Sequence, residues 1–529
     1  MTSTNRVNFT ERHEKGGWAV YLPAISAFYT AQLGKMDKDP NFRGRPIPAG
    51  FEYAHYGLNQ LDESKGYFHY KWGLYSAGHA HLDITKSDSE EPMIQKRDRS
   101  KTMILGDSGG FQIATGVLKL DWATVKGPGG DKLREQILRW LEHTADWSMT
   151  LDVPAFAAVG NLSKKTGLTK FEDTLDITEH NLKYFMKNRV PGATKFLNVL
   201  SGSSPENSKV WYDTVVPYSI PACVEAMGYT ADRTLEGYAF AGINMKSMPS
   251  VLNRVLDLRR DGALAGKDWI HFLGIGRLDW AAYLTSLMRV LRKHDNPNLT
   301  ISFDAASPYV ATAYGLAYNY NTFDSKRLTY QMDKAIDQKD MVGSQLAMPF
   351  QSPIMDRMVV GDVCVLGPND PNKNKKIGKT SWDTFSYLLY MQHNLYNHIQ
   401  AVQEINRLSD IEHIRKAATF EASDVSRTKG PISIFVPNTI LFFEKIINEI
   451  LDPVLTDTEA RDKLEYYNLF LESISFGGIN GETKAKDTSE QMFDWNAVNV
   501  EVADADVMAD TQNEVTDAKL TELENLLKD

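Results

Sequence analysis

The chain has 529 residues, of which 42% are hydrophobic and 24% are charged, a balance typical of a soluble globular protein. This length allows one large domain or two to three ordinary ones. No uninterrupted apolar run reaches the about 18 residues that a membrane span needs, and the polar N-terminus has no apolar signal segment. Two cysteines, Cys223 and Cys364, cannot form a disulfide framework. We therefore expect a cytoplasmic protein that contacts no membrane.

The net charge of −10 lies mostly at one end of the chain. Residues 484–529 contain 12 acidic residues and 4 lysines, which leaves a net charge of −2 for residues 1–483. This composition predicts a disordered acidic tail, apart from a helix at residues 516–527. The nearly neutral body does not exclude a nucleic acid as a partner, because a local basic face needs no overall positive charge.

Short apolar runs, each followed by a polar or glycine-rich turn, recur along the chain. We predict strands at residues 18–23, 103–106, 147–151, 196–200, 238–241, 269–273 and 299–303. From residue 103 onward, neighbouring runs leave room for a helix between them. Helical spacing of apolar residues is visible at 133–143, 280–293, 382–408 and 438–451. Residues 51–81, which are rich in Tyr, His and Gly, are interpreted as an inserted segment.

Alternating strands and helices favour a parallel α/β fold. Polar residues at the ends of successive strands are typical of a (β/α)₈ barrel, the TIM barrel, whose active site lies at that end. A doubly wound sheet is the alternative, but no GxGxxG motif follows a first strand. The expected organisation is an N-terminal elaboration with the first barrel strands (1–100), the main part of the barrel (101–345), a helical C-terminal subdomain (346–483) and the tail (484–529).

Three aspartates directly follow predicted strands: Asp107, Asp152 and Asp304. A carboxylate at the end of a buried strand is costly unless it is paired or does chemical work. For each one alone, capping of the next helix is an equally good explanation. Because three occur, with two glycines beside Asp107, we expect them to share one site.

The residues around these aspartates resemble motifs of the tRNA-guanine transglycosylase family. The order and spacing hold over residues 100–320, and a weaker match, His-Asn-Leu-Tyr from residue 393, extends to about residue 400. The matches in chain order are DSGGFQ at 107–112, Asp152 before Val-Pro, Gly202 in the family's Gln-Gly turn, Ala-Gly-Ile at 241–243, Leu-Gly-Ile-Gly at 273–276, and Asp304 with Pro308 and Gly315 behind it.

The resemblance implies a TIM-barrel enzyme that exchanges a guanine in a nucleic acid for a free 7-deazaguanine base, with no required cofactor. Asp304 would be the nucleophile that forms a covalent glycosyl-enzyme, and Asp107 the general acid and base. Asp152 would accept hydrogen bonds from the base. The other implied base contacts are Ser201 in place of the family's Gln, Gly202, the backbone of Gly242 and Ile243, and a sandwich of Phe111 and Leu273. For Phe111, an ordinary place in the core is an equal alternative.

Two departures point away from tRNA. The family's tRNA-specific enzymes hold phosphates with two arginines, and the matching positions here are Val310 and Ala313, which cannot pair with phosphate. His271 stands where the family usually has Tyr. Within the superfamily the chain most resembles the DpdA-type enzymes of bacteria and bacteriophages. Those enzymes place 7-deazaguanine derivatives, such as preQ0, in DNA, where the modification blocks restriction nucleases.

The family's zinc site is incomplete in this chain. Cys364 and His393 keep the family's spacing, but the other two Cys positions are Asp362 and Gly367. Two or three ligands are too few for a closed structural zinc site, and we expect a reduced subdomain without zinc, with Asp362 as the one candidate for a third ligand. Candidate phosphate contacts are Arg277, the basic run 95–101 (QKRDRSK), and the loop lysines Lys373, Lys375, Lys376 and Lys379.

The expected function is therefore base exchange on DNA. Two alternatives remain open. One is base exchange on tRNA or another RNA. The other is a non-catalytic, nucleic-acid-binding subunit of such an enzyme, although such subunits tend to lose the three aspartates that this chain keeps. The expected partners are DNA, or alternatively tRNA, and the free base, and a homodimer is compatible with the sequence.

Overall fold

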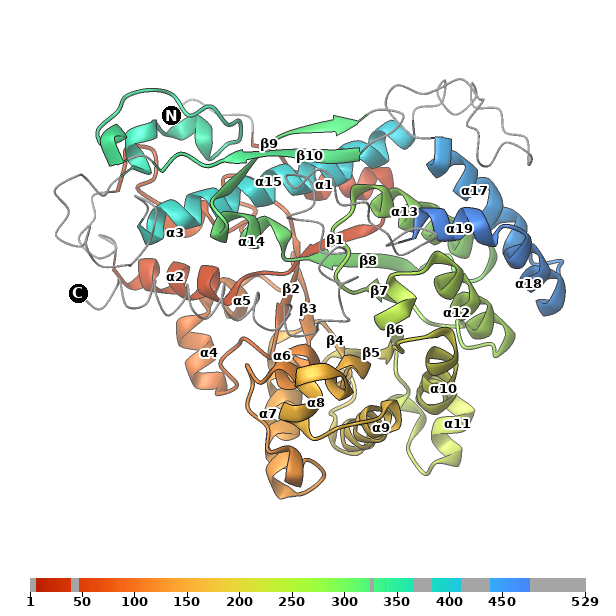
Figure 1. Cartoon of the computed structure of the whole chain (residues 1–529). Coiled ribbons are helices and arrows are strands. Elements are labelled where there is room, and N and C mark those ends of the chain that lie inside the picture. Colours follow the sequence, from red (N-terminus) through yellow and green to blue (C-terminus); the bar gives the residue numbers. More distant parts are fainter. Residues whose placement is uncertain are drawn as a thin grey trace.

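The computed structural model describes residues 6–39, 47–323, 328–337, 339–364, 383–410 and 438–475. Within them, eight parallel strands form one sheet in the order β1-β8-β7-β6-β5-β4-β3-β2 (Figure 1). These strands are β1 (Val20–Pro23), β2 (Trp72–Ser76), β3 (Met103–Asp107), β4 (Trp147–Met149), β5 (Lys195–Leu200), β6 (Gly237–Phe240), β7 (Trp269–Phe272) and β8 (Thr300–Ala305).

The sheet curls into a nearly closed barrel because its two edge strands, β1 and β2, approach each other. Just beyond β1, Ala24 forms a parallel bridge with Leu74 of β2, and the N–H of Ile25 donates to the carbonyl oxygen of Leu74 at 2.9 Å. The predicted α/β barrel is therefore confirmed as a TIM-like architecture. Strand β2 was not predicted, since it lies inside the segment 51–81 that was interpreted as an insertion.

Helices cover the outside of the barrel between successive strands, so the strands are buried on both faces and consist mostly of apolar residues. In chain order the helices from α2 to α13 are α2 (Ala27–Lys38), α3 (Ala54–Gly57), α4 (Ile84–Glu90), α5 (Pro92–Gln95), α6 (Gly110–Thr115), α7 (Pro128–Thr144), α8 (Gly160–Thr166), α9 (Phe171–Asn188), α10 (Pro205–Val215), α11 (Pro221–Ala226), α12 (Met248–Arg260) and α13 (Leu278–His294). Short 3₁₀ turns, such as η2 (Ala155–Ala158) and η5 (Gly242–Met245), follow some strands directly.

A long helix from the C-terminal region takes the place of the eighth barrel helix. After β8 come α14 (Ser307–Ala313) and the antiparallel hairpin of β9 (Leu316–Phe323) and β10 (Leu328–Lys334). Helix α15 (Thr384–Ser409) then packs beside α13, α14 and the N-terminal α1 (Phe9–Gly16). At its end, Asp410 accepts hydrogen bonds from Trp18 at 2.8 Å and from Arg289 of α13 at 2.7 Å, which fasten the helix to the barrel.

The last described helices lie against the outside of the barrel. These are α17 (Asn438–Ile450), α18 (Asp457–Tyr466) and α19 (Asn468–Ile474), shown in blue in Figure 1, and they pack on α12 and α13. The predicted acidic tail, 484–529, falls outside the described residues. Among the helices that the structure describes, none combines the length and apolar character needed to cross a membrane.

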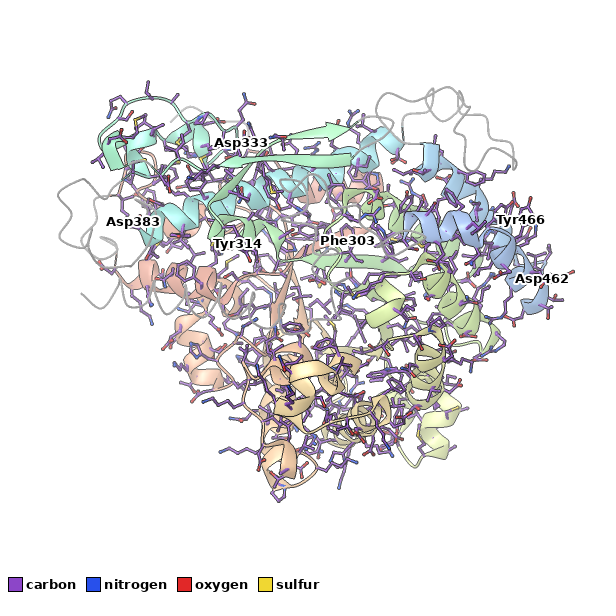
Figure 2. All side chains as sticks on the ribbon, viewed as in Figure 1. Phe303, Tyr314, Asp333, Asp383, Asp462 and Tyr466 are labelled. Atoms are coloured by element: carbon purple, nitrogen blue, oxygen red, sulfur yellow. The ribbon has the colours of Figure 1, made fainter. Side chains whose placement is uncertain are left out.

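Side chains fill the space inside the barrel and between its strands and helices (Figure 2). Phe303 of β8 is 1% exposed, and the side chains of Trp140, Trp211 and Trp280 are completely buried. Tyr466, at the end of α18, is 70% exposed on the outer surface. The densely packed interior fixes the strands, and with them the residues at the strand ends.

Candidate active site

The three aspartates lie at the carboxyl end of the barrel. Asp107 is the last residue of β3, Asp304 is the next-to-last residue of β8, and Asp152 follows the end of β4 by three residues. Because all eight strands are parallel, these positions lie around one end of the barrel. The charge of Asp304 acts on Asp107, and that of Asp107 acts on Asp152. The structure therefore brings together the carboxylates that the sequence singled out.

Asp107 is surrounded by groups with opposing effects on its charge. Burial raises the pKa of its carboxyl group, and the charge of Asp304 adds to this shift. The Ser76 hydroxyl, which donates to Oδ2 at 2.6 Å, and the N–H of Gly109, which donates to Oδ1 at 3.3 Å, lower the pKa again. A carboxyl group in this balance is suited to give and take a proton. Sequence reasoning missed Ser76, because it ends the unpredicted strand β2.

Two glycines explain the Asp-Ser-Gly-Gly sequence after β3. Gly109 has a φ of +83°, and a Cβ there would lie 2.7 Å from the Cα of Gly78. A Cβ on Gly110 would lie 2.4 Å from the carbonyl oxygen of Asp152 and 2.9 Å from its Oδ1. Larger residues would push apart the turns that follow β2, β3 and β4. The two glycines therefore allow the turns of Asp107 and Asp152 to touch.

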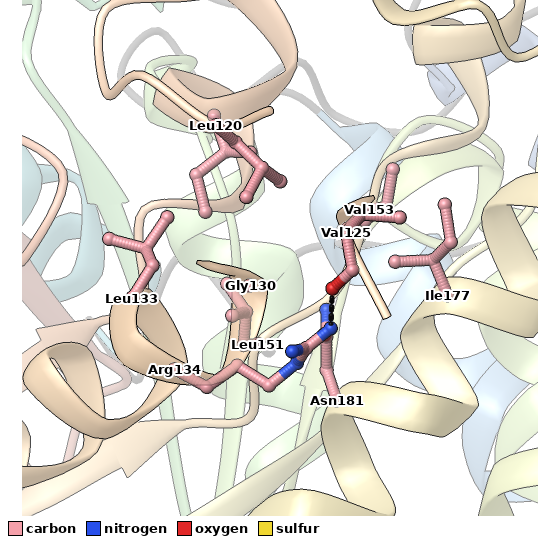
Figure 3. Close-up of a pocket in the computed structure, with 10 residues that line it drawn as sticks. Leu120, Val125, Gly130, Leu133, Arg134, Leu151, Val153, Ile177 and Asn181 are labelled. Atoms are coloured by element: carbon pink, nitrogen blue, oxygen red, sulfur yellow. Dashed lines mark hydrogen bonds between the residues drawn. The ribbon is translucent and has the colours of Figure 1, made fainter. Parts of the chain in front are cut away.

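The turn of Asp152 rests on a nearly filled interior. Beneath it lies a cavity of about 10 Å³, lined in part by its neighbours Leu151 and Val153 (Figure 3). This volume is room for roughly one water molecule. The guanidinium group of Arg134 donates to the carbonyl oxygen of Val125 at the edge of the cavity. The cavity is thus too small for an organic ligand, and the carboxylate end of the barrel remains the candidate site.

Asp304 is held through one of its two oxygens. Its Oδ1 accepts a hydrogen bond from the N–H of Gly274 at 2.8 Å and lies 3.2 Å from Nε2 of His271. In the part of the chain that the structure describes, no group donates to Oδ2. The Asp304 side chain is 14% exposed. The carboxylate is therefore oriented through one oxygen, while the other receives no hydrogen bond from the described residues.

The hydrogen bond from His271 is itself fixed by a chain of donors. The indole N–H of Trp269 donates to Oγ of Ser302 at 2.7 Å, and this Oγ lies 2.8 Å from Nδ1 of His271. A carboxylate can only accept, so Nε2 of His271 carries a ring proton and donates it to Asp304. In the neutral ring, Nδ1 then accepts the proton of the Ser302 hydroxyl, whose oxygen accepts from Trp269. His271 is fully buried, so this arrangement is shielded from water.

The predicted base-contacting turns lie side by side after β5 and β6. The N–H of Ile243 donates to the carbonyl oxygen of Gly202 at 2.9 Å, and the Ile243 carbonyl accepts from two later N–H groups of its own turn. The backbone groups of Ile243, which were predicted to contact the base, are therefore already hydrogen-bonded within the protein, and the Ile243 N–H ties the two turns together. At Gly242, the N–H has no partner among the described residues, and this group keeps its predicted role. Ser201 is buried at 3% exposure beside it.

Phe111 and Leu273 follow β3 and β7, and both side chains are half-buried. The Phe111 ring lies 5.6 Å from the ring of Phe156, at an interplanar angle of 60°. Leu273 packs against the main core, and its N–H donates to the carbonyl oxygen of Phe240 at 3.1 Å. Each therefore contacts its neighbours on one side and keeps some exposed surface on the other. The sandwich around a base remains a prediction.

Arg277, a candidate phosphate contact, is engaged within the protein. Its guanidinium group binds both carboxylate oxygens of Asp279, with 3.0 Å from Nε to Oδ1. It also donates to the carbonyl oxygen of Ser475, at the end of α19, at 3.1 Å. Its side chain is 29% exposed. Arg277 thus joins α19 to the barrel, and the loop lysines Lys373, Lys375, Lys376 and Lys379 fall outside the described residues.

The two arginines of the basic run 95–101 are engaged within the protein. Arg97 donates to Asp146 at 2.7 Å, and its side chain is 1% exposed. Arg99 binds the same carboxylate and two carbonyl oxygens nearby. Asp146 directly precedes β4, so these contacts lie at the amino end of the strands, opposite the three aspartates. Arg97 is therefore too buried to contact a phosphate, and for the rest of the run the phosphate contact stays a prediction.

His393, one of the two positions that remain from the zinc site of the family that the chain resembles, is engaged within the protein. Both ring nitrogens of His393 have partners: Nε2 lies 2.7 Å from the carbonyl oxygen of Tyr318, and Nδ1 lies 2.9 Å from Oγ of Ser352. Burial lowers the pKa of His393 to about 4, although the hydrogen bond to Tyr318 opposes this shift. No group of three His, Cys, Asp or Glu side chains within the described ranges could hold a metal ion.

No protein-family model matches this chain, and no curated protein matches it either. Its likeness to a family therefore depends on the motifs and on the geometry around them.

The raised pKa of Asp152 gives a prediction about stability. Burial, with the charge of Asp107, raises this pKa to about 7, whereas an unfolded Asp titrates near about 4. The stability that the group contributes is thus complete below about pH 4 and is lost as the pH rises to about 7. Asp152→Asn removes this titration. Its melting temperature relative to wild type should therefore be higher at about pH 8 than at about pH 5.

Thermal melts of both proteins at the two pH values measure this difference. Asp213→Asn, at an exposed ion pair with a lysine (Lys209) and with no histidine, is the control and should show no such trend. A relative melting temperature of Asp152→Asn that is equal or lower at the higher pH contradicts the raised pKa.

The expected zinc content of the purified protein is far below one atom per chain, as measured by elemental analysis. Cys364 is buried, and Asp362 accepts a hydrogen bond from the N–H of Val359 at 2.8 Å as a helix cap. Stoichiometric zinc that Cys364→Ser removes would contradict this expectation. Zinc that Cys364→Ser leaves in place would show a site elsewhere in the chain.

Proposed function

We propose that this chain is a base-exchange transglycosylase that replaces guanine in DNA with a 7-deazaguanine derivative. The observation that carries the proposal is the arrangement of the three aspartates at one end of the barrel. Asp304 is oriented by a backbone N–H and a histidine, while Asp107 and Asp152 have raised pKa values. A nucleophile beside a proton-transferring carboxyl group is what exchange at a glycosidic carbon requires.

The proposed exchange has two steps, which form and then break a covalent bond between Asp304 and the sugar. In the first, Oδ2 of Asp304 attacks C1′ of the sugar, the bond from C1′ to N9 of guanine breaks, and Asp107 gives its proton to the leaving base. In the second, Asp107 takes a proton from the incoming base, whose nitrogen attacks C1′ and displaces the Asp304 carboxylate. The hydrogen bonds to Oδ1 stabilise the carboxylate as it leaves. Asp152 and the N–H of Gly242 would hold the base.

The helix after the nucleophile favours DNA over tRNA as the substrate. This helix, α14, carries Val310 and Ala313, neither of which can bind a phosphate. Arg277, the nearest cation in sequence after β7, is bound to Asp279 and α19. The grip on a tRNA backbone that the related family uses is thus absent from these positions. DNA, held at other positions, is therefore the polymer that we propose.

Asp304→Asn should abolish exchange of radiolabelled guanine and form no covalent adduct with the nucleic acid, because an amide oxygen is a poor nucleophile.

Asp107→Asn should lower the rate of exchange by about 10²–10⁴ while nucleic-acid binding persists. Filter binding and intact-protein mass spectrometry separate the two effects. Asp213→Asn is the control. Near wild-type incorporation by Asp304→Asn would show that another group is the nucleophile.

Matched DNA and tRNA substrates, compared in one buffer, test the choice of polymer. We expect labelled guanine to enter DNA, and to enter single-stranded or mismatched DNA faster than a perfect duplex, because extruding a paired base costs a few kcal/mol. Efficient labelling of tRNA with none of DNA would contradict the DNA assignment and leave the exchange chemistry intact. Labelling of neither polymer, with both still bound, would favour the non-catalytic subunit.

A further inference from the structure

The turns after β5 and β6 are packed so tightly that neither can move alone. A Cβ on Gly242 would lie 2.2 Å from the carbonyl oxygen of Gly202, and a Cβ on Gly202 would lie 2.5 Å from the Cα of Ser208 in α10. The hydrogen bond from Ile243 to Gly202 joins the two turns. These turns hold the residues proposed to contact the base, so their relative position sets the shape of the base-binding surface.

A buried asparagine fastens the two turns to each other. The side chain of Asn244 is completely buried. Its Nδ2 donates to the carbonyl oxygen of Leu200 at 3.0 Å and lies 3.4 Å from that of Ser201. Its Oδ1 accepts from the hydroxyl of Ser208 at 2.8 Å. One side chain from the β6 turn therefore holds the end of β5 and the start of α10.

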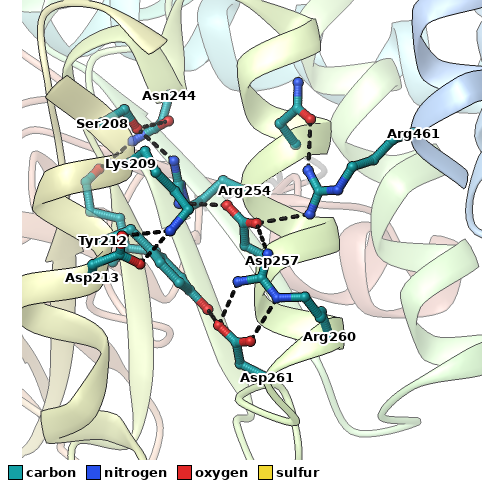
Figure 4. Close-up of polar contacts among 12 residues, drawn as sticks. Ser208, Lys209, Tyr212, Asp213, Asn244, Arg254, Asp257, Arg260, Asp261 and Arg461 are labelled. Atoms are coloured by element: carbon teal, nitrogen blue, oxygen red, sulfur yellow. Dashed lines mark hydrogen bonds and ion pairs between the residues drawn. The ribbon is translucent and has the colours of Figure 1, made fainter. Parts of the chain in front are cut away.

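Ser208 connects this asparagine to a group of arginines around one buried carboxylate (Figure 4). Arg254 of α12 donates to Oγ of Ser208 at 3.1 Å and to Oδ2 of Asp257 at 2.7 Å. The Asp257 side chain is 5% exposed. Its other oxygen accepts from Arg260 and from Arg461, each at 2.8 Å. Arg461 belongs to α18, so the chain of hydrogen bonds runs from the outer helices to the base-binding turns.

Each link in this chain has one role. The carbonyl oxygen of Leu200 can only accept, so the amide of Asn244 is fixed with its nitrogen toward Leu200 and its oxygen toward Ser208. The Ser208 hydroxyl therefore donates to Asn244, and its oxygen accepts from Arg254, which can only donate. Removing one link leaves a buried polar group without a partner, which is more costly than the hydrogen bond itself is favourable. The chain therefore transmits the position of Asp257 to the turns.

We propose that Ser208, Asn244 and Arg254 are positioning residues for base binding, and that the docking of α18 through Arg461 and Asp257 sets the geometry of the base-binding turns. This inference depends on the proposed function. In this arrangement the C-terminal helices are part of the construction of the site, although none of the linked side chains needs to touch the base. A displaced α18 loosens Arg254, and the two turns lose their common support.

Ser208→Ala tests the chain with the smallest change in volume. It should raise KM for radiolabelled guanine about tenfold, the loss expected for one hydrogen bond to a charged partner, with kcat nearly unchanged. Tyr212→Phe is the matched control. The Tyr212 hydroxyl donates to Asp261 at 2.8 Å in the same cluster, and its ring lies beside Arg254, but this branch does not lead to Asn244. The control should keep the wild-type KM.

Arg461→Ala tests the transmission from α18. It should raise KM in the wild-type background and raise it no further in the Ser208→Ala background, because the two residues act through one chain. Independent effects of the two substitutions, or an unchanged KM in folded Ser208→Ala, overturn the inference while wild-type exchange stands. A wild-type protein that exchanges no guanine on DNA or RNA overturns the proposed function instead. Circular dichroism confirms folding of each variant.

Discussion

Three carboxylates at one end of a barrel repel each other and lose hydration, and this electrostatic cost must be offset by hydrogen bonds from their neighbours. The number of these hydrogen bonds differs from one aspartate to the next. Asp304 receives two hydrogen bonds on one oxygen, whereas Asp107 receives one on each oxygen. Asp152 receives little compensation, and its pKa rises to about 7. Unequal donors thus place three chemically identical side chains in three different environments, which is what the separate roles proposed for them require.

The nearly closed barrel makes this arrangement possible because it fixes which residues meet. Parallel strands bring every carboxyl end to one rim, and the short turns after β3 and β4 are drawn together by glycines that leave no room for a Cβ. On the other side of the rim, the hydrogen bonds from Trp269 through Ser302 to His271 likewise fix the position of a side chain. There, alternate side chains of β7 and β8 point inward and orient the carboxylate of Asp304.

The fold and the three aspartates could be predicted from sequence because both are local patterns, an apolar run followed by a turn. Strand β2 could not, because Trp72–Ser76 is short and lies among aromatic residues that suggested an insertion. Because this strand was missed, Ser76, which donates a hydrogen bond to Asp107, was missed as well. The pairing of Arg97 with Asp146 and of Arg277 with Ser475 was also out of reach, since the partners lie 49 and 198 residues away. A charged side chain in a sequence shows its charge but not whether that charge is already neutralised.

The contacts of the helices beyond the barrel could not be predicted from the sequence either, because their partners are also distant in the chain. In sequence, α15 and α17–α19 belong to a region separate from the barrel, yet α15 completes the ring of helices and Arg461 of α18 donates to the buried Asp257. A carboxylate that accepts from three arginines is fixed in place, since moving it would strand several charges in a poorly hydrated interior. Asp257 is therefore held rigidly behind the turns after β5 and β6. Hydrogen bonds through Arg254, Ser208 and Asn244 connect it to these turns, so the packing of the outer helices would fix the position of the turns where the base would bind.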